Sequence, residues 1–261
     1  MQNIVVVVPM RNERECVKPL FRKFESALPA VDASCRVVVV DGDSTDGTPD
    51  AVRAFSDRLP VEVLELGGDR GLGGALEAGL VRALEIPTLD AVVTMDGDDS
   101  HDPHTIPSML SKLREGYDLV VASRFEEGGR EVGVAGHRRA LSHAASRLLR
   151  TLFPVGSVKD YSSGFRAYRI AALRRVQESF GRLVEERGFS CMMELLLKLR
   201  AVGVQAAEVP LVLRYDLKRS ESKMDVLPTI RRYLAVMGRN LRHAPGRDPG
   251  SWPDEVGRDA A

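Results

Sequence analysis

The chain has 261 residues, of which 44% are hydrophobic and 28% charged, and its formal net charge is zero. This composition is that of an ordinary globular protein, and the apolar runs are far shorter than the ~20 residues that span a membrane. We therefore exclude a membrane-spanning chain and expect no nucleic-acid partner. The three cysteines are widely spaced and form no CxxC pair, which indicates a reducing, cytoplasmic setting.

Charge is divided unevenly between the two halves of the chain. Residues 1–130 carry 23 acidic and 14 basic side chains, whereas residues 131–261 carry 14 acidic and 23 basic ones. This asymmetry indicates an acidic half suited to cations and a basic half suited to phosphates or to an anionic membrane surface. Scattered, solvated charge is the alternative interpretation.

Strand patterns alternate with helix patterns through the first half. Short β-branched runs predict strands at residues 3–9, 35–41, 60–66, 89–96 and 117–123. Apolar residues at helical spacing predict helices at residues 15–28, 73–85 and 106–115. This alternation predicts an α/β fold with a mostly parallel central sheet and helices on both faces.

Polar clusters follow the first, second and fourth predicted strands, at residues 11–13, 41–46 and 96–102. In parallel sheets, ligands bind outside the carboxyl ends of the strands. Three clusters at equivalent positions therefore predict a binding site at that edge of the sheet.

The second half contains two basic amphipathic helix patterns, at residues 138–153 and 226–243. Such helices either lie on a membrane surface or pack against the sheet with their arginines in solvent. Residues 245–261 are rich in proline, glycine and charge, and we expect them to be disordered.

The segment "MDGDDSHDP" places Asp96 and Asp98 two residues apart after the fourth strand. In extended backbone such residues point the same way, and Gly97 between them allows a ligand to approach closely. Two carboxylates completed by phosphate oxygens suit a hard divalent cation such as Mg²⁺ or Mn²⁺. We expect Asp102 to cap the next helix instead.

Two nucleotide-binding classes are excluded. The segment "GLGGAL" places Leu76 where a dinucleotide-binding fingerprint has its third glycine, and no P-loop GKS or GKT is present. A haloacid-dehalogenase-like phosphatase remains an alternative, because "DGDDS" resembles its nucleophile loop. That loop usually follows the first strand, whereas here it follows the fourth.

Six segments in order resemble the family 2 glycosyltransferases of GT-A fold, and within them the polyprenol-phosphate (dolichol-phosphate) mannose synthases. The segments are "VVVVPMRNERE", "VVVVDGDSTDGT", "MDGDDSHDP", "VVASRF", "DYSSGFRAY" and "RSESK". Arg11 stands where the family usually has Tyr, and Ser100 where some relatives have Gln. The resemblance implies a nucleotide-diphospho-sugar transferase fold and binding of Mg²⁺ or Mn²⁺.

The resemblance also assigns roles to individual residues. It implies a nucleotide-sugar site formed by Pro9, Arg11, Glu13, Val39, Asp41, Asp96, Gly97, Asp98, Arg219 and Lys223. It implies that Asp96 and Asp98 hold the metal and, with Arg124, are the catalytic residues. It implies that the acceptor phosphate is bound by Arg124, Arg138 and Ser142.

A phosphate acceptor is mostly a dianion at neutral pH and needs no general base, whereas a hydroxyl acceptor does. Relatives that act on hydroxyls usually carry an ED pair late in the domain. Here that stretch has Glu194 alone in an apolar helix, where we expect it to be structural. This absence favours a phosphate acceptor.

We therefore predict a metal-dependent, inverting glycosyltransferase that moves a hexose, mannose first, from GDP-mannose or a UDP-hexose to a polyprenyl phosphate. The alternatives are a transferase acting on a hydroxyl, the phosphatase, and a non-catalytic nucleotide-binding subunit. We expect a transferase domain at residues 1–225, a basic amphipathic helix at 226–244 and a tail at 245–261. Contact with the membrane is expected to be peripheral, on the cytoplasmic face.

Overall fold

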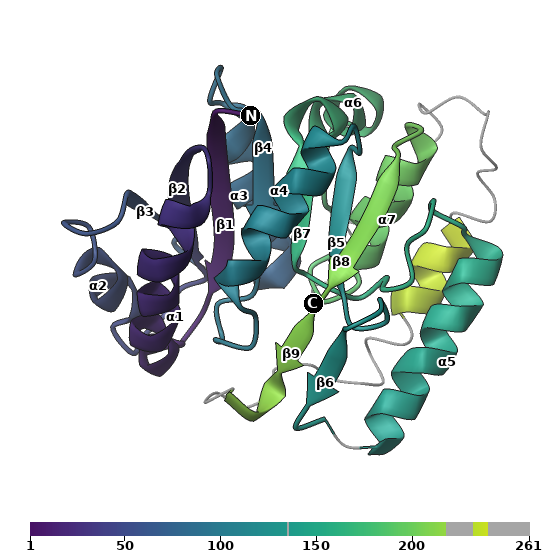
Figure 1. The fold of residues 1–261 in the computed structure, drawn as a ribbon, viewed down its shortest axis with the longest axis horizontal. Helices are drawn as coiled ribbons and strands as arrows, with labels where there is room; N and C mark the ends of the chain where they lie inside the picture. The colour runs from purple at the N-terminus through teal and green to yellow at the C-terminus, as the bar shows by residue number, and fades with distance from the viewer. Residues whose placement is uncertain (135, 218–231, 240–261) are drawn as a thin grey trace, which may run out of the picture.

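The computed structural model describes residues 1–134, 136–217 and 232–239, and its centre is a seven-stranded sheet (Figure 1). The strand order is β3-β2-β1-β4-β7-β5-β8. The bounds are β1 (Asn3–Met10), β2 (Ser34–Asp41), β3 (Val61–Glu65), β4 (Ala91–Thr94), β5 (Leu119–Ser123), β7 (Arg166–Arg169) and β8 (Ala206–Pro210). Every pairing is parallel except the two made by β7, so the mostly parallel sheet expected from the sequence is confirmed.

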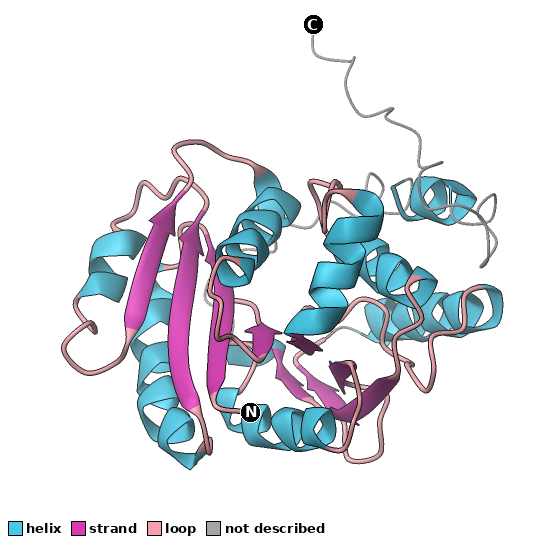
Figure 2. Ribbon diagram, turned by 90° about the horizontal axis from the view of Figure 1, so that it is seen from above, coloured by secondary structure: helices cyan, strands magenta, loops and turns pink. Residues whose placement is uncertain are grey.

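Helices cover both faces of the sheet, as Figure 2 shows from above. One face is covered by α1 (Arg14–Ala27), α2 (Thr48–Arg53) and α4 (Ile106–Arg114). The other is covered by α3 (Gly71–Leu84), α5 (Gly136–Leu152), α6 (Ile170–Phe180), α7 (Cys191–Ala201) and the helix at residues 232–239. Among the described residues, no helix is both long enough and apolar enough to cross a bilayer.

The valine runs explain why the centre of the sheet forms. In β1, Val5 and Val7 pack into the cluster beneath α3, while Val6 and Val8 pack into the cluster beneath α1. A strand that is apolar on both faces is stable only when helices cover both sides. These strands therefore form the middle of the sheet.

The strand β7 departs from the parallel pattern and was not predicted. It runs antiparallel between β4 and β5, with Thr94 opposite Arg166. The chain reaches it by leaving the sheet after β5 and passing through β6 (Arg130–Val132) and α5. A separate two-stranded ribbon joins β6 to β9 (Val212–Arg214), and short 3-10 helices occupy Leu28–Ala30, Pro103–Thr105 and Tyr215–Leu217.

Candidate active site

The carboxyl ends of β2, β1 and β4 lie next to one another, which brings the three predicted polar clusters to one edge. Val7 is in register with both Val38 and Thr94, and Met10 is opposite Asp41. The loops that carry these clusters therefore leave the sheet side by side, as the parallel topology predicts.

The loops after β1 and β2 are tied together by side chain–backbone hydrogen bonds. Asn12 donates its N–H to Ser44 Oγ (2.8 Å) and accepts the Thr45 N–H at its side-chain oxygen (2.8 Å). Asn12 and Asp43 have positive φ angles of 50° and 69°, in the left-handed region that asparagine and aspartate tolerate best. This cross-linking holds the two loops in one arrangement.

Glu13 and Asp41, two expected nucleotide ligands, are both buried at this junction. The Ser44 N–H donates to Asp41 Oδ2 (2.9 Å), whereas Asp41 Oδ1 is buried without a hydrogen-bond partner in the described part of the chain. Buried acceptors are normally satisfied, so Oδ1 suits a donor supplied by a ligand. The Glu13 N–H donates to Thr48 Oγ1 (3.0 Å).

Pro9, Arg11 and Val39 lie nearby but in different environments. Pro9 is half-buried at the end of β1, and Arg11 is exposed and paired with Asp69 (NH1 to Oδ2, 2.6 Å). The Val39 side chain is fully buried in the core beneath α1, because it alternates along β2 with Val38 of the opposite face. The side chain of Val39 therefore supports the pocket from within the core.

The loop after β4 gives each of its carboxylates a partner. Asp99 pairs with Lys23 (2.6 Å), and Asp98 Oδ1 accepts hydrogen bonds from the backbone and hydroxyl of Ser100. Asp102 accepts the His104 N–H (3.1 Å), which confirms its predicted capping role. These contacts offset the repulsion among four nearby acidic residues.

Asp96 is held by a residue that the sequence reasoning missed. The Asp96 N–H donates to Nδ1 of His101 (3.2 Å), and His101 Nε2 lies 3.9 Å from Asp96 Oδ2. His101 is buried and stacks on Phe165 of the segment before β7, with ring centroids 5.2 Å apart. The position of His101 inside an acidic segment was the feature of the sequence that could have indicated this contact.

Two glycines permit close packing around the same loop. A Cβ on Gly97 would lie 2.5 Å from Met10 Cγ and 3.0 Å from the Pro9 carbonyl oxygen. Gly97 is therefore required for packing of the loop against β1, where the sequence suggested close approach of a ligand. A Cβ on Gly164 would lie 2.8 Å from Asp96 Oδ1, so this glycine makes room for the carboxylate.

The carboxylate oxygens of Asp96 and Asp98 fit a hard divalent cation that a bound ligand also coordinates. The Asp96 side chain is 36% exposed, whereas Asp98 is buried and oriented by Ser100. In the described residues, no group of three histidine, cysteine or acidic side chains is arranged to hold a metal. Two carboxylates from one loop suit an ion whose coordination is completed by phosphate oxygens.

Arg124, an expected acceptor ligand, is bound within a buried charge network. Its Nε and NH2 donate to the two oxygens of Asp160 (2.7 and 2.8 Å), and its NH1 donates to Glu131 (2.8 Å). Burial opposes ionisation of Asp160, but the charge and hydrogen bonds of Arg124 outweigh it and lower the pKa of Asp160. Asp160 and Glu131 were not predicted as partners of Arg124; Asp160 is 36 residues away along the chain, and Glu131, seven residues away, belongs to no motif.

The remaining expected ligands are described only in part. Arg138 and Ser142 lie four residues apart on α5, which follows the β6 segment; Ser142 is half-buried, and the Arg138 side chain is outside the described part of the structure. Arg219 and Lys223 also lie outside the described residues, as does the tail at 245–261.

Glu194 is structural, as expected. Its carboxylate accepts the backbone N–H groups of Glu185 and Glu186 at 2.9–3.1 Å and pairs with the buried Lys198 (2.9 Å). A carboxylate with its acceptor capacity used in this way orders the 185–190 loop and is not placed to act as a base.

Comparison with solved structures identifies the fold. Glucosyl-3-phosphoglycerate synthase from Mycobacterium tuberculosis, in complex with phosphoglyceric acid, superposes with a TM-score of 0.63 at 24% identity, over 90% of this chain and 78% of that one. Its complex with Mn²⁺, UDP and phosphoglyceric acid gives 0.62 at 23% identity, over 97% and 80%. Together with the strand order and the site at the carboxyl edge, this establishes the GT-A glycosyltransferase fold.

The family model for glycosyl transferase family 2 matches residues 5–177, so the chain belongs to this family and is a glycosyltransferase. Dolichol-phosphate mannosyltransferase of Pyrococcus furiosus is 30% identical over 98% of this chain, which spans 66% of that protein. Undecaprenyl-phosphate mannosyltransferase of Micrococcus luteus is 33% identical over 85% of this chain and 87% of its own length. Polyprenol monophosphomannose synthase of Mycolicibacterium smegmatis is 31% identical over 80% and 77%. The resemblance seen in the sequence is confirmed, and the phosphatase alternative is set aside.

Proposed function

We propose that the protein transfers a mannosyl group from a nucleotide-diphosphate sugar to a polyprenyl phosphate, with inversion at the anomeric carbon. Three relatives at 30–33% identity are named for mannosyl transfer to dolichol, undecaprenyl or polyprenol phosphate. The observation that carries the proposal is that Asp96 and Asp98, after β4, share one edge of the sheet with the buried, unsatisfied Asp41 Oδ1 at the end of β2. A diphosphate and a nucleobase would find their partners there.

The donor binds across the ends of β1, β2 and β4. Asp41 Oδ1 accepts an N–H from the nucleobase, and Arg11 leaves or shares its exposed pair with Asp69 to contact the nucleotide. Asp96 and Asp98 would hold a divalent ion, and solved complexes of a protein with the same fold contain UDP with Mn²⁺ or Mg²⁺. That ion would neutralise charge on the departing diphosphate. Arg219 and Lys223, which the resemblance assigns to the diphosphate, complete the site in this proposal.

The acceptor needs no base from the protein. An oxygen of the phosphate dianion bonds to the anomeric carbon while the carbon–oxygen bond to the diphosphate breaks, and the electron pair leaves with the nucleoside diphosphate. We assign Arg138 and Ser142 to the acceptor phosphate. Because Asp160, Ser162 and Glu131 accept four of the five N–H donors of Arg124, we assign it chiefly to ordering the surrounding loops. The second N–H of its NH1 can contact the phosphate.

The acceptor is a lipid, so the enzyme works at a membrane surface. We place it peripherally on the cytoplasmic face, through the basic surface of α5 and the helix at residues 232–239. Residues 136–152 include four arginines and no acidic residue, which supports attraction to anionic lipid.

The test is transfer of labelled sugar from a panel of nucleotide sugars to a short polyprenyl phosphate, with and without Mg²⁺ or Mn²⁺. Asp96→Ala and Asp98→Ala should lose transfer and metal-dependent nucleotide binding while remaining folded. Asp102→Ala is the matched control, since it removes a carboxylate from the same loop that serves only as a helix cap. Equal activity of all three variants, or transfer to the dephosphorylated alcohol, would overturn the proposal.

A further inference from the structure

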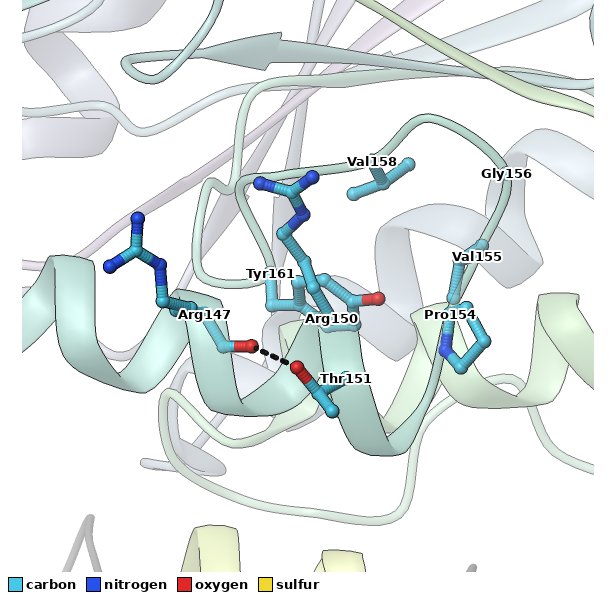
Figure 3. Close-up of a pocket in the computed structure, with 8 residues that line it drawn as sticks. All are labelled: Arg147, Arg150, Thr151, Pro154, Val155, Gly156, Val158 and Tyr161. Atoms are coloured by element: carbon cyan, nitrogen blue, oxygen red, sulfur yellow. Dashed lines mark hydrogen bonds between the residues drawn. The ribbon is translucent and has the colours of Figure 1, made fainter.

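A cavity of about 460 Å³ lies between the last turns of α5 and the segment at residues 154–161 (Figure 3). Arg147, Arg150 and Thr151 line it from α5, and Tyr161 lines it from the facing segment. Both guanidinium groups project to the same side of α5 in Figure 3. The proposed function assigns no role to this cavity.

Among the side chains that line the cavity, the two arginines have hydrogen-bond donors to offer a ligand, because both hydroxyl groups already donate within the protein. The Thr151 hydroxyl donates to the Arg147 carbonyl oxygen (3.0 Å), and the Tyr161 hydroxyl donates to the Phe153 carbonyl oxygen (2.6 Å). Arg147 and Arg150 are exposed, and neither forms an ion pair with another residue in the described ranges. Two guanidinium groups at one opening suit a group with several anionic oxygens, which a phosphate provides.

The local charge favours an anion further. No acidic residue occurs anywhere from Gly133 to Val158. A third arginine, Arg200, binds the Pro154 carbonyl oxygen at the rim (3.0 Å). The one acidic residue in the facing segment, Asp160, is completely buried and paired with Arg124, so the exposed arginines of the cavity have no carboxylate partner in these two segments.

The cavity is separate from the expected acceptor site. Arg150 is eight residues beyond Ser142 on α5, which corresponds to about 12 Å along a helix axis. Ser142 is not among the residues that line the cavity, so we treat the cavity as distinct from the expected acceptor site. The cavity would take a second anion.

Exposed leucines beside the cavity indicate where that phosphate comes from. Leu148 and Leu152 are 52% and 40% exposed, and they lie one turn apart on the same helix as the two arginines. Large apolar side chains next to basic ones are typical of a helix that lies in a membrane interface. A phosphate attached to acyl chains would engage both sets of residues.

We propose that this cavity binds the phosphate headgroup of an anionic phospholipid, with Leu148 and Leu152 entering the bilayer beside it. The inference deepens the proposed function and rests on its membrane-borne acceptor. It assigns Arg147 and Arg150 to attachment of the protein to the membrane. Neither residue takes part in the transfer reaction.

The test is flotation of the full chain with phosphatidylcholine vesicles and with mixed phosphatidylcholine–phosphatidylglycerol vesicles. Arg147→Ala/Arg150→Ala should lower the partition coefficient for the mixed vesicles roughly 30-fold, since each arginine near an anionic surface contributes about fivefold. Arg22→Ala/Arg174→Ala removes the same charge from exposed positions on α1 and α6 and should change it less than about twofold. Unchanged thermal unfolding of both variants excludes misfolding.

Two further measurements distinguish a headgroup site from attraction by charge alone and from a site for a free phosphate compound. Arg147→Lys/Arg150→Lys keeps the charge but loses the forked geometry, so binding should be only partly restored. Full restoration would mean that the surface attracts membranes by charge alone, and the cavity would have no specific role. Glycerol phosphate in solution should displace the protein from vesicles only weakly. Complete displacement would make a free phosphate compound the ligand and overturn the lipid assignment.

The same assays distinguish failure of the cavity assignment from failure of the proposed function. Transfer to a water-soluble, short polyprenyl phosphate in the absence of vesicles should be unchanged in Arg147→Ala/Arg150→Ala. A wild-type chain that binds mixed vesicles but transfers no sugar to that acceptor would refute the proposed function alone. Equal binding of wild type and the double variant to mixed vesicles would refute the cavity assignment alone.

Discussion

The substitution Asp160→Asn should destabilise the protein strongly, because it removes one partner of a buried ion pair. Asp160 is completely buried, and its two oxygens receive the Nε and NH2 donors of Arg124 at 2.7 and 2.8 Å. An asparagine side chain keeps the shape but loses the charge and one of the two acceptors. The guanidinium then remains in a buried site with part of its compensation missing.

The size of the effect follows from these contacts. A hydrogen bond between charged groups contributes about 1.5–3 kcal/mol, and breaking a buried pair costs about 3–5 kcal/mol. Glu131 still accepts from Arg124 NH1 (2.8 Å), so the arginine is not left without an anion. We therefore expect a loss near the lower end, about 3 kcal/mol in the free energy of unfolding, measured by urea denaturation at neutral pH.

A double-mutant cycle isolates the pair. Arg124→Met should destabilise at least as much as Asp160→Asn, because it leaves both Asp160 and Glu131 buried without the cation. The combination Arg124→Met/Asp160→Asn removes both charges of the pair, so its loss should be smaller than the sum of the single losses. Strict additivity of the two positions, or a loss below about 1 kcal/mol for Asp160→Asn, would contradict this reasoning.

The dependence of stability on pH gives a second test of the same pair. The pKa of Asp160 is lower in the folded protein than in the unfolded chain. Its contribution is therefore fully present above the unfolded value, about 3.9, and is lost as the pH falls through the lower folded value. Stability should decline less steeply below about pH 4 in Asp160→Asn than in the wild type. Parallel declines would show that another carboxyl group is responsible.

Three further predictions concern the loop after β4, which carries Asp96 and Asp98, and the 185–190 loop. Gly164→Ala should weaken metal-dependent nucleotide binding about tenfold, measured by calorimetry. The added Cβ would lie 2.8 Å from Asp96 Oδ1, which is too close, so the Asp96 carboxylate would have to move. His101→Ala should lower kcat by about tenfold to a hundredfold, since the Asp96 N–H loses a buried acceptor worth about 1–3 kcal/mol. Glu194→Gln should lower the thermal unfolding midpoint while leaving kcat within about twofold, whereas loss of a general base would lower it by about 10²–10⁴.

Each of these three has an outcome that would contradict it. Wild-type nucleotide affinity in Gly164→Ala would mean that Asp96 moves without consequence for the metal. Full activity of His101→Ala at normal stability would reduce the histidine to a packing residue. A large drop in kcat for folded Glu194→Gln would restore the hydroxyl-acceptor alternative.

The strands that the sequence predicted are short runs rich in β-branched residues, and the clearest are the uninterrupted valine runs of β1 and β2. β1 and β2 are apolar on both faces, and only a strand covered by helices on both sides accommodates such a run. β7 has the sequence "RAYR", whose two arginines suggest solvent. Arg166 is nevertheless completely buried, since it donates to the carbonyl oxygens of Met192 and Tyr161 (2.6 and 2.9 Å). Those acceptors exist only after the chain has folded.

The part of the site that the sequence predicted is the part placed by strand ends. Asp41 ends β2, and Asp96 and Asp98 follow β4. The carboxyl ends of parallel strands share one edge of the sheet, so the position of these residues at that edge could be inferred. The partner of Arg124 could not be, because Asp160 is 36 residues away along the chain. Gly97 shows a subtler limit: the sequence indicates that small size is needed there, and only the packing against Met10 shows why.

The antiparallel insertion of β7 between β4 and β5 has a consequence for how such enzymes diversify. The described residues assigned to the sugar donor lie on or directly after β1, β2 and β4 and precede Ser123. Arg124, Ser142 and the α5 cavity lie on the excursion between β5 and β7. Both ends of that excursion are fixed in the middle of the sheet. In the proposed function, the residues assigned to the acceptor thus lie within residues 124–165, so we expect a chimera that receives this segment from a relative to acquire the relative's acceptor preference and keep its own sugar donor.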